Sequence, residues 1–234
     1  RKAFMKKFLC TVLAVGALTA CSTTKYQIEG HTSLTNLDGK KIYVKTVHGE
    51  DLNDLDSCEI VHGRFAMEGA LDTVHMAVLF MDDQSLMPLV LEPASMVISI
   101  ADTAWRVTGT EMNDQLYEFL HAKGRLEGEL QELPRRENRM ILDGKDEYEI
   151  QQVLSGEVNR IQQSYDKLVM KYVTSNFDNM LSVGVFMMHT MGQPPLLTPQ
   201  IEDIMSKATQ VFKDDPYIKW YIQAAESNMR SVGR

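Results

Sequence analysis

The side chains in this chain of 234 residues that could do chemistry are a few histidines, a methionine cluster, an acidic run and three cysteines. The most specific catalytic motifs are the Gly-x-Ser-x-Gly elbow, the His-Glu-x-x-His pair, the phosphate-binding loop and Cys-x-x-Cys, because each fixes a reactive group in a known local structure. The sequence contains none of them. We therefore expect a protein that is not an enzyme and that uses no cofactor.

The histidines are the first candidates for a metal site. His48, His62 and His75 lie in the strand-rich first half and could converge with Asp56 or Glu59 as ligands. Their spacings match no standard zinc pattern, and one of them falls in an expected turn. Solvated or hydrogen-bonded histidines are therefore favoured, and no metal is predicted.

Two other runs suggest metals only superficially. The run 51–56 is acidic like a calcium loop, but it lacks the central Gly and the bidentate Glu that such loops need, so we expect a solvated acidic turn. Met187, Met188 and Met191 could supply thioether ligands to copper. They fall on the apolar face of an expected helix, which favours core packing.

The first residues read as an export signal. Four basic side chains precede an uncharged run over residues 8–20, which is shorter than the ~20 residues of a spanning helix. The run ends in Leu18-Thr19-Ala20-Cys21, which resembles the lipobox of bacterial lipoproteins. We expect residues 1–20 to be a signal peptide, Cys21 to be acylated, and residues 21–25 to form a lipidated linker. An ordinary secretory signal with a chance cysteine is the alternative.

Charge and location follow from that signal. The chain has 24 basic and 32 acidic residues; removal of residues 1–20 takes away four basic ones and leaves a net charge near -12. Such a body has no basic stripe for nucleic acid, and its contact with the membrane should come from the lipid anchor alone. Residues 22–25 lack the acidic run that resembles a surface-export signal, so a periplasm-facing position in the cell envelope is favoured.

The same signal decides how the cysteines are used. Cys10 would be removed and Cys21 acylated, which leaves Cys58 as the one ordinary thiol. No disulfide within the mature chain is then possible, and Cys58 is expected to be a small core residue rather than a reactive thiol.

The elements that must position these residues fall into two regions, an N-terminal β domain over residues 26–110 and a helical region over 111–234. The N-terminal region contains short strand-like runs about ten residues apart, with no helical pattern between them. This spacing predicts an antiparallel β-sandwich or barrel. The predicted strands are 26–30, 41–46, 57–61, 64–69, 74–81, 86–91, 95–101 and 105–109. Asp38-Gly39 and His62-Gly63 are expected turns. Glu92, before Pro93 at a strand end, is the carboxylate we expect to be partly buried.

The second region changes to the period of a helix, so the fold class is α+β. One helix is expected to begin near Met112 and to end at Pro134, and a longer one to run over residues 150–172. The two predict an antiparallel hairpin, with residues 135–146 as its turn. A very apolar helix should follow over residues 180–191, and Thr198-Pro199 and Asp215-Pro216 predict two further helix starts.

The order of motifs along the chain resembles a family. The motifs in the first part are Gln27-Ile28-Glu29-Gly30, the runs 37–44 and 61–69, Asp56-Ser57, Leu89-Val90-Leu91-Glu92-Pro93 and the run 107–113. They resemble the N-terminal domain of unknown function (4369 type) that precedes thioredoxin-like modules in lipoproteins of gut-type Gram-negative bacteria. Ser175-Asn176-Phe177-Asp178-Asn179 and Leu197-Thr198-Pro199 are similar to later landmarks of those proteins.

The resemblance implies two functional hypotheses. In such proteins a redox module with Cys-x-x-Cys follows shortly after a Val-Gly dipeptide, which here is Val232-Gly233 near the end of the given sequence. The leading hypothesis is a non-catalytic, membrane-anchored binding or spacer module. The alternative is the N-terminal portion of, or a partner to, a periplasmic thiol-disulfide oxidoreductase whose redox domain lies outside this chain.

A third hypothesis is that the β domain binds a glycan or peptide ligand. The aromatic residues to test would be Tyr43, Phe65, Phe80 and Trp105. They lie in apolar strand runs, so core packing is the favoured interpretation of all four.

Overall fold

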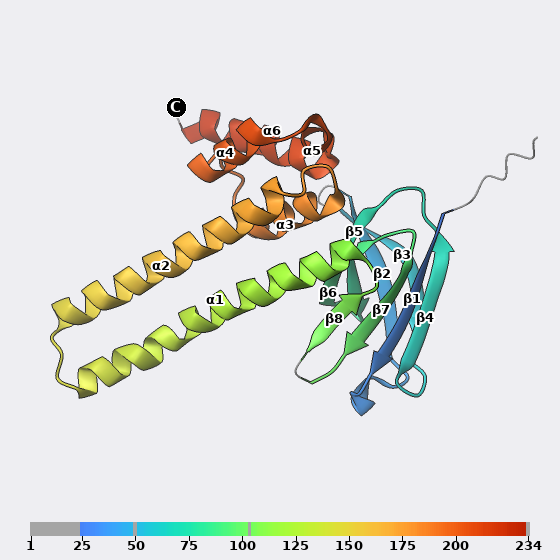
Figure 1. Cartoon of the computed structure of the whole chain (residues 1–234), viewed down its shortest axis with the longest axis horizontal. Coiled ribbons are helices and arrows are strands. Elements are labelled where there is room, and N and C mark those ends of the chain that lie inside the picture. The colour runs from blue at the N-terminus through green and yellow to red at the C-terminus, as the bar shows by residue number, and fades with distance from the viewer. Residues whose placement is uncertain (1–23, 49–50, 103, 233–234) are drawn as a thin grey trace, which may run out of the picture.

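The computed structural model describes residues 24–48, 51–102 and 104–232. Strands occupy residues 25–108, and helices begin at residue 111. The predicted α+β class is confirmed, with two sheets packed as a sandwich and a helical region after them (Figure 1). The signal segment and Cys21 lie outside the described residues.

Each layer of the sandwich has four strands, in the orders β4-β1-β7-β8 and β3-β2-β5-β6. The first sheet contains β1 (Lys25–Thr32), β4 (Arg64–Ala70), β7 (Ser95–Ile100) and β8 (Trp105–Thr108). The second contains β2 (Lys41–His48), β3 (Asp51–Glu59), β5 (His75–Met81) and β6 (Gln84–Leu91). The pairs are antiparallel apart from β1 and β7, which run parallel.

The core of the sandwich follows the alternation of the strands. Ile42 and Val44 on β2 are fully buried, while Tyr43 between them faces the outside. The expected tight turn between β3 and β4 is confirmed, since His62 and Gly63 both have positive φ, 51° and 71°.

The acidic run at residues 51–56 is not the turn that we expected. It forms the first part of β3, an edge strand paired with β2. Lys45 of β2 lies 3.0 Å from Asp54, and the exposed carboxylates along this strand keep other strands from adding to the edge.

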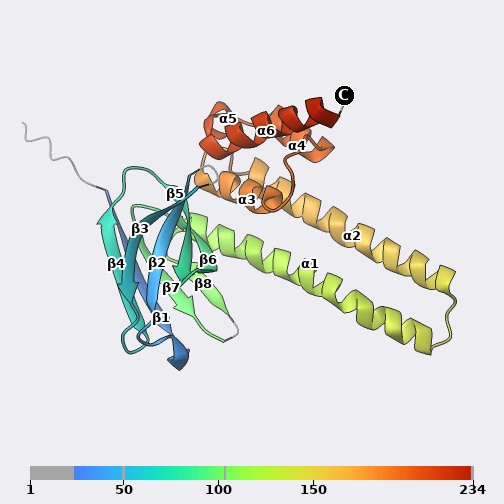
Figure 2. The ribbon, with the colours of Figure 1, turned by 180° about the vertical axis from the view of Figure 1, so that it is seen from behind.

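Six helices follow the sandwich in the part of the chain that the structure describes, and the first two form the predicted hairpin. They are α1 (Glu111–Leu142), α2 (Glu147–Thr174), α3 (Met180–Thr190), α4 (Pro199–Lys207), α5 (Gln210–Asp214) and α6 (Pro216–Val232). Figures 1 and 2 show the hairpin projecting away from the sandwich, with α3–α6 gathered beside α2 at its root. None of the described helices is both long enough and apolar enough to cross a membrane.

The prediction that Pro134 ends the first helix is wrong. The helix continues to Leu142 although an interior Pro costs about 3 kcal/mol, because packing against α2 holds the turns on both sides of it. The stop lies at Gly144, whose φ is 73°. The amide of Gly144 donates to the carbonyl of Ile141, and the amide of Lys145 donates to that of Met140, which is a Schellman motif. The turn is thus residues 143–146.

The third helix joins the two regions. Seven consecutive residues of α3, from Leu181 to Met187, are buried, as its apolar sequence predicted. Gly184 leaves room for Met76 of β5, so the helix lies directly on the sandwich. Phe186 makes edge-on contacts with Phe212 and Tyr221 of the later helices.

Two details of the C-terminal part differ from expectation. Met191 caps α3 and is 62% exposed, so it does not share the buried environment of Met187. The short helix α5 was not predicted. Thr198-Pro199 and Asp215-Pro216 do precede helices, and Thr198 accepts a hydrogen bond from the amide of Ile201.

Candidate functional site

The first two turns of α1 close an open edge of the sandwich. β6 is the edge strand of its sheet, and its outer side would leave backbone groups without partners. The Asn113 side chain meets this need: its Oδ1 accepts from the Val90 amide at 2.9 Å, and its Nδ2 donates to the Val90 carbonyl at 2.7 Å. One side-chain amide thus occupies the place of a peptide group on a neighbouring strand.

Two neighbouring interactions complete this edge. The Tyr117 hydroxyl donates to the carbonyl of Pro88 at 2.9 Å. Pro88 itself has no amide hydrogen to satisfy, which suits an edge strand. Thr110 caps the helix, and its hydroxyl oxygen lies 2.8 Å from Nδ2 of Asn113.

Glu92 lies at the end of the same edge. It is half-buried, as predicted, and burial raises the pKa of its carboxyl above the usual range. Hydrogen bonds from Thr110 and Asn113 lower that pKa, and the charge of Glu111 raises it again. The carboxyl therefore acts in the hydrogen-bond network that joins β6 to α1.

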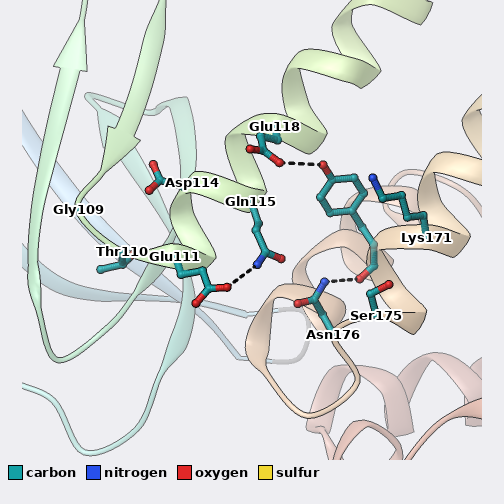
Figure 3. Close-up of a pocket in the computed structure, with 10 residues that line it drawn as sticks. Gly109, Thr110, Glu111, Asp114, Gln115, Glu118, Lys171, Ser175 and Asn176 are labelled. Atoms are coloured by element: carbon teal, nitrogen blue, oxygen red, sulfur yellow. Dashed lines mark hydrogen bonds between the residues drawn. The ribbon is translucent and has the colours of Figure 1, made fainter.

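A polar cleft with a volume of about 720 Å³ lies on one side of these turns, between the start of α1 and the end of α2 (Figure 3). Glu111, Asp114 and Glu118 line it from α1, and Lys171 faces them from α2. Just after α2, Nδ2 of Asn176 donates to the carbonyl of Tyr172 at 2.9 Å. The two carboxylates of the first turn complement the helix dipole, which explains them without catalysis.

A second depression lies on the other side of α1, and we call it the edge groove. It runs between β6 and β8, the last strands of their sheets, and has a volume of about 710 Å³. Its walls are mainly apolar, and the side chains that form them are Leu86, Met87, Pro88, Trp105, Tyr117 and Leu120. Trp105 is 38% exposed, so part of its ring remains available to a ligand.

The rim of the edge groove is more basic than the rest of the chain. Arg106, His121 and Arg125 line it, with Glu118 as the acidic member. Arg106 lies 3.5 Å from Asp114 in an exposed ion pair, while Arg125 makes no ion pair within the described part of the chain. The groove thus combines apolar walls with two arginines and one carboxylate at its rim.

The comparison with known families addresses the N-terminal part of the chain. Residues 26–116 match a family described as Domain of unknown function (DUF4369). This part of the chain is a DUF4369 domain. No curated protein matches the chain.

The match extends beyond the last strand into α1, and the contacts explain why. The DUF4369 domain ends at Leu116, three residues after Asn113. The sandwich and the two helical turns that satisfy β6 therefore form one unit, while most of the hairpin lies outside the match.

The structure separates the aromatic residues that the sequence suggested as ligand contacts. Trp105 lines the edge groove, whereas Phe65 is buried inside the DUF4369 domain against Gly30. Tyr43 and Phe80 are cross-strand neighbours on the outer face of the second sheet, and the Lys45 ammonium lies 5.0 Å from the Phe80 ring centre. Tyr43 and Trp105 thus belong to different surfaces.

The remaining candidates from the sequence are the Cys58 thiol and the possible metal ligands. Cys58 is a free, half-buried thiol, and burial raises its pKa, which disfavours the thiolate form. Among the residues that the structure describes, no group of His, Cys, Asp and Glu side chains is arranged to hold a metal ion.

The sequence interpretation missed Asn113, Tyr117 and the basic rim. A signal for Asn113 was present, because Asn113, Leu116 and Leu120 fall on one face of the helix and a polar residue on an apolar face needs a partner. The groove has no such signal, since it is formed by β6, β8 and α1 together.

Proposed function

We propose that this chain is a lipid-anchored protein of the bacterial cell envelope, and that its DUF4369 domain is a non-catalytic binding module. The observation that carries the proposal is the edge groove, where an exposed Trp105 and apolar walls lie beside cationic side chains. Cys21, in the lipobox-like sequence, is the proposed site of acylation.

The placement of the elements supports this role. β1 begins at Lys25, four residues after Cys21, and four residues span at most ~14 Å. Acylation would therefore hold the start of β1 close to the bilayer. Figures 1 and 2 place the hairpin on the opposite side of the sandwich from the start of β1, so α1 and α2 would extend away from that anchor.

The groove chemistry indicates the class of ligand. The chain carries a net charge of -8, so an anionic group finds few favourable surfaces on it, and Arg106 and Arg125 provide one. The walls suit one or two bulky apolar side chains. We therefore propose that the ligand is a segment of a partner protein with acidic residues next to aromatic or aliphatic ones.

Short synthetic peptides that combine acidic and bulky apolar residues test the groove. Trp220→Phe leaves Trp105 as the fluorescent reporter, and binding should change its emission. Trp105→Ala and Arg125→Glu should each weaken capture about tenfold or more, which corresponds to about 1.4 kcal/mol. Tyr43→Ala is the matched control and should bind normally. Equal loss in Tyr43→Ala, or unchanged capture in Trp105→Ala, would remove the groove from the proposal.

The anchor needs a separate experiment. Cells that express the full chain are grown with an alkyne-tagged fatty acid, and the label is then detected on the protein. We expect label on the native sequence and none on Cys21→Ala. Label that persists in Cys21→Ala would contradict acylation at this residue, whatever the groove binds.

A further inference from the structure

A third depression lies where the DUF4369 domain meets the later helices, and we call it the junction pocket. It has a volume of about 700 Å³. Val74 and Met112 line it from the DUF4369 domain, while the segment 177–183 and α5 line it from the helical region. Figures 1 and 2 show α5 and the start of α3 beside one end of the sandwich. Ligand pockets occur preferentially at such junctions between structural units.

The walls of the junction pocket are mainly apolar. Phe177 and Phe212 are buried and contact each other edge-on, with their ring centres 5.1 Å apart. The Thr209 hydroxyl donates to the carbonyl of Phe177 at 3.1 Å, which ties the start of α5 to the segment before α3. Val211 also lines the pocket, and it is 64% exposed. The pocket therefore combines a fixed aromatic wall with an apolar side chain that a ligand can cover.

The charged side chains that line the junction pocket are all acidic, and they are Asp178, Asp214 and Asp215. No Lys, Arg or His among the described residues lines it. Asp214 lies 2.8 Å from Lys219, and the Asp215 carboxylate accepts two backbone amides at the start of α6. Asp178 forms no ion pair within the part of the chain that the structure describes, and Asn179 caps α3 in its place. One exposed carboxylate is thus left for a cation.

We infer that the junction pocket binds a segment of a partner protein in which a Lys or Arg side chain lies next to aliphatic ones. The cation pairs with Asp178, and the aliphatic side chains cover Val211 and the apolar walls. A protein segment is favoured over a small molecule, because a small molecule is buried over about 70–90% of its surface in its pocket. Here Asp178 and Val211 are both exposed, so only one side of a ligand would be enclosed.

The junction pocket and the edge groove differ in charge. Arg106 and Arg125 line the groove, whereas the charged residues of the junction pocket are carboxylates. Like charges that meet at an interface are costly, so a basic segment is favoured at the junction pocket and an acidic one at the groove. The two depressions share no lining residue, so binding at one does not require binding at the other.

Methionine methyl resonances of the full chain in a non-ionic detergent report on the two depressions separately. Met112 and Met180 line the junction pocket, and Met87 lines the edge groove. The probe is a capped Ala-Leu-Arg-Leu-Ala peptide, and Ala-Leu-Glu-Leu-Ala is its matched control. We expect the basic peptide to shift the resonances of Met112 and Met180 to saturation and the acidic one to leave them unchanged. Equal shifts with both peptides, or no shift at these two methyls up to millimolar peptide, would overturn the inference.

Reversal of one charge tests the role of the carboxylate. Asp178→Lys replaces attraction by repulsion, so the affinity for the basic peptide, measured from the same shifts, should fall about tenfold or more. Asp83→Lys makes the same change in the exposed turn between β5 and β6 and should bind normally. Both residues are exposed, so circular dichroism should show an unchanged fold. An affinity that is the same in Asp178→Lys as in the native chain would contradict pairing at this carboxylate.

Discussion

The sandwich and the free part of the hairpin are stabilised by different interactions. In the sandwich, two sheets bury fully enclosed side chains such as Ile42, Leu79 and Ile98. In the hairpin beyond residue 123, one seam holds two helices, supported by exposed ion pairs that individually contribute little. The contrast teaches that the sandwich has a closely packed core, while the free hairpin depends on one seam and should open more easily.

Asn113 marks the boundary between these two regimes. Up to that residue α1 serves the sandwich, because its side chain completes the edge of β6. Beyond it the same helix leaves the sandwich and pairs with α2. The match to DUF4369 ends close to this change, at residue 116.

The largest effect is expected from the sandwich core. Leu79→Ala removes a fully buried side chain and should lower the free energy of unfolding by about 2–5 kcal/mol. Urea denaturation followed by circular dichroism measures this. Leu79→Met preserves the volume and should cost less than about 1.5 kcal/mol. Similar losses from both substitutions would show that the core is not closely packed there.

The second-largest loss of stability is expected at Asn113, the boundary between the sandwich and the hairpin. Asn113→Ala leaves the amide and carbonyl of Val90 buried without partners, at about 1–3 kcal/mol each, so a loss of about 2 kcal/mol or more is expected. Gln115→Ala, two residues away with its side chain outside the sandwich, should have little effect. If the two variants were equally stable, Asn113 would not be needed to close the edge.

A smaller and local effect is expected in the hairpin. Ile161→Ala should cost about 2 kcal/mol, the low end for such a truncation, because the surrounding seam is thin and can collapse. Hydrogen exchange should rise in α1 and α2 beyond residue 123 and stay unchanged in the strands. Faster exchange throughout the sandwich would show that the two regions unfold together.

The smallest effect concerns pH at the boundary. Burial raises the pKa of Glu92, so the folded chain binds this proton more tightly than the unfolded chain does. The resulting stabilisation is present at low pH and is lost as the pH rises from the unfolded pKa, about 4.3, through the folded one. Glu92→Gln should remove this slope in denaturation measured across that range. An unchanged slope would place the titration elsewhere.

The sequence predicted much of the fold because its signals are local. Strand alternation, the His62-Gly63 turn and the helix starts at Thr198 and Asp215 depend on neighbouring residues, and the structure has them. The prediction that the first helix ends at Pro134 was wrong because it considered only the local cost of an interior Pro. Packing of α1 against α2 outweighs that cost. Gly144 was a local stop signal that the interpretation passed over.

The candidate site was harder to predict because it depends on distant parts of the chain. Trp105 was a candidate, but only the meeting of β6, β8 and α1 distinguishes it from Phe65. The run 51–56 is a strand rather than a turn because β2 pairs with it. Sequence patterns alone do not specify such register and edge contacts.

Hydrogen exchange of the full chain tests the contrast most directly. We predict that the amides of α1 and α2 between residues 126 and 161 exchange faster than those of the paired inner strands β1, β2, β5 and β7, because one seam holds the hairpin while two sheets enclose the sandwich core. Strands that exchange as fast as the hairpin would contradict the account.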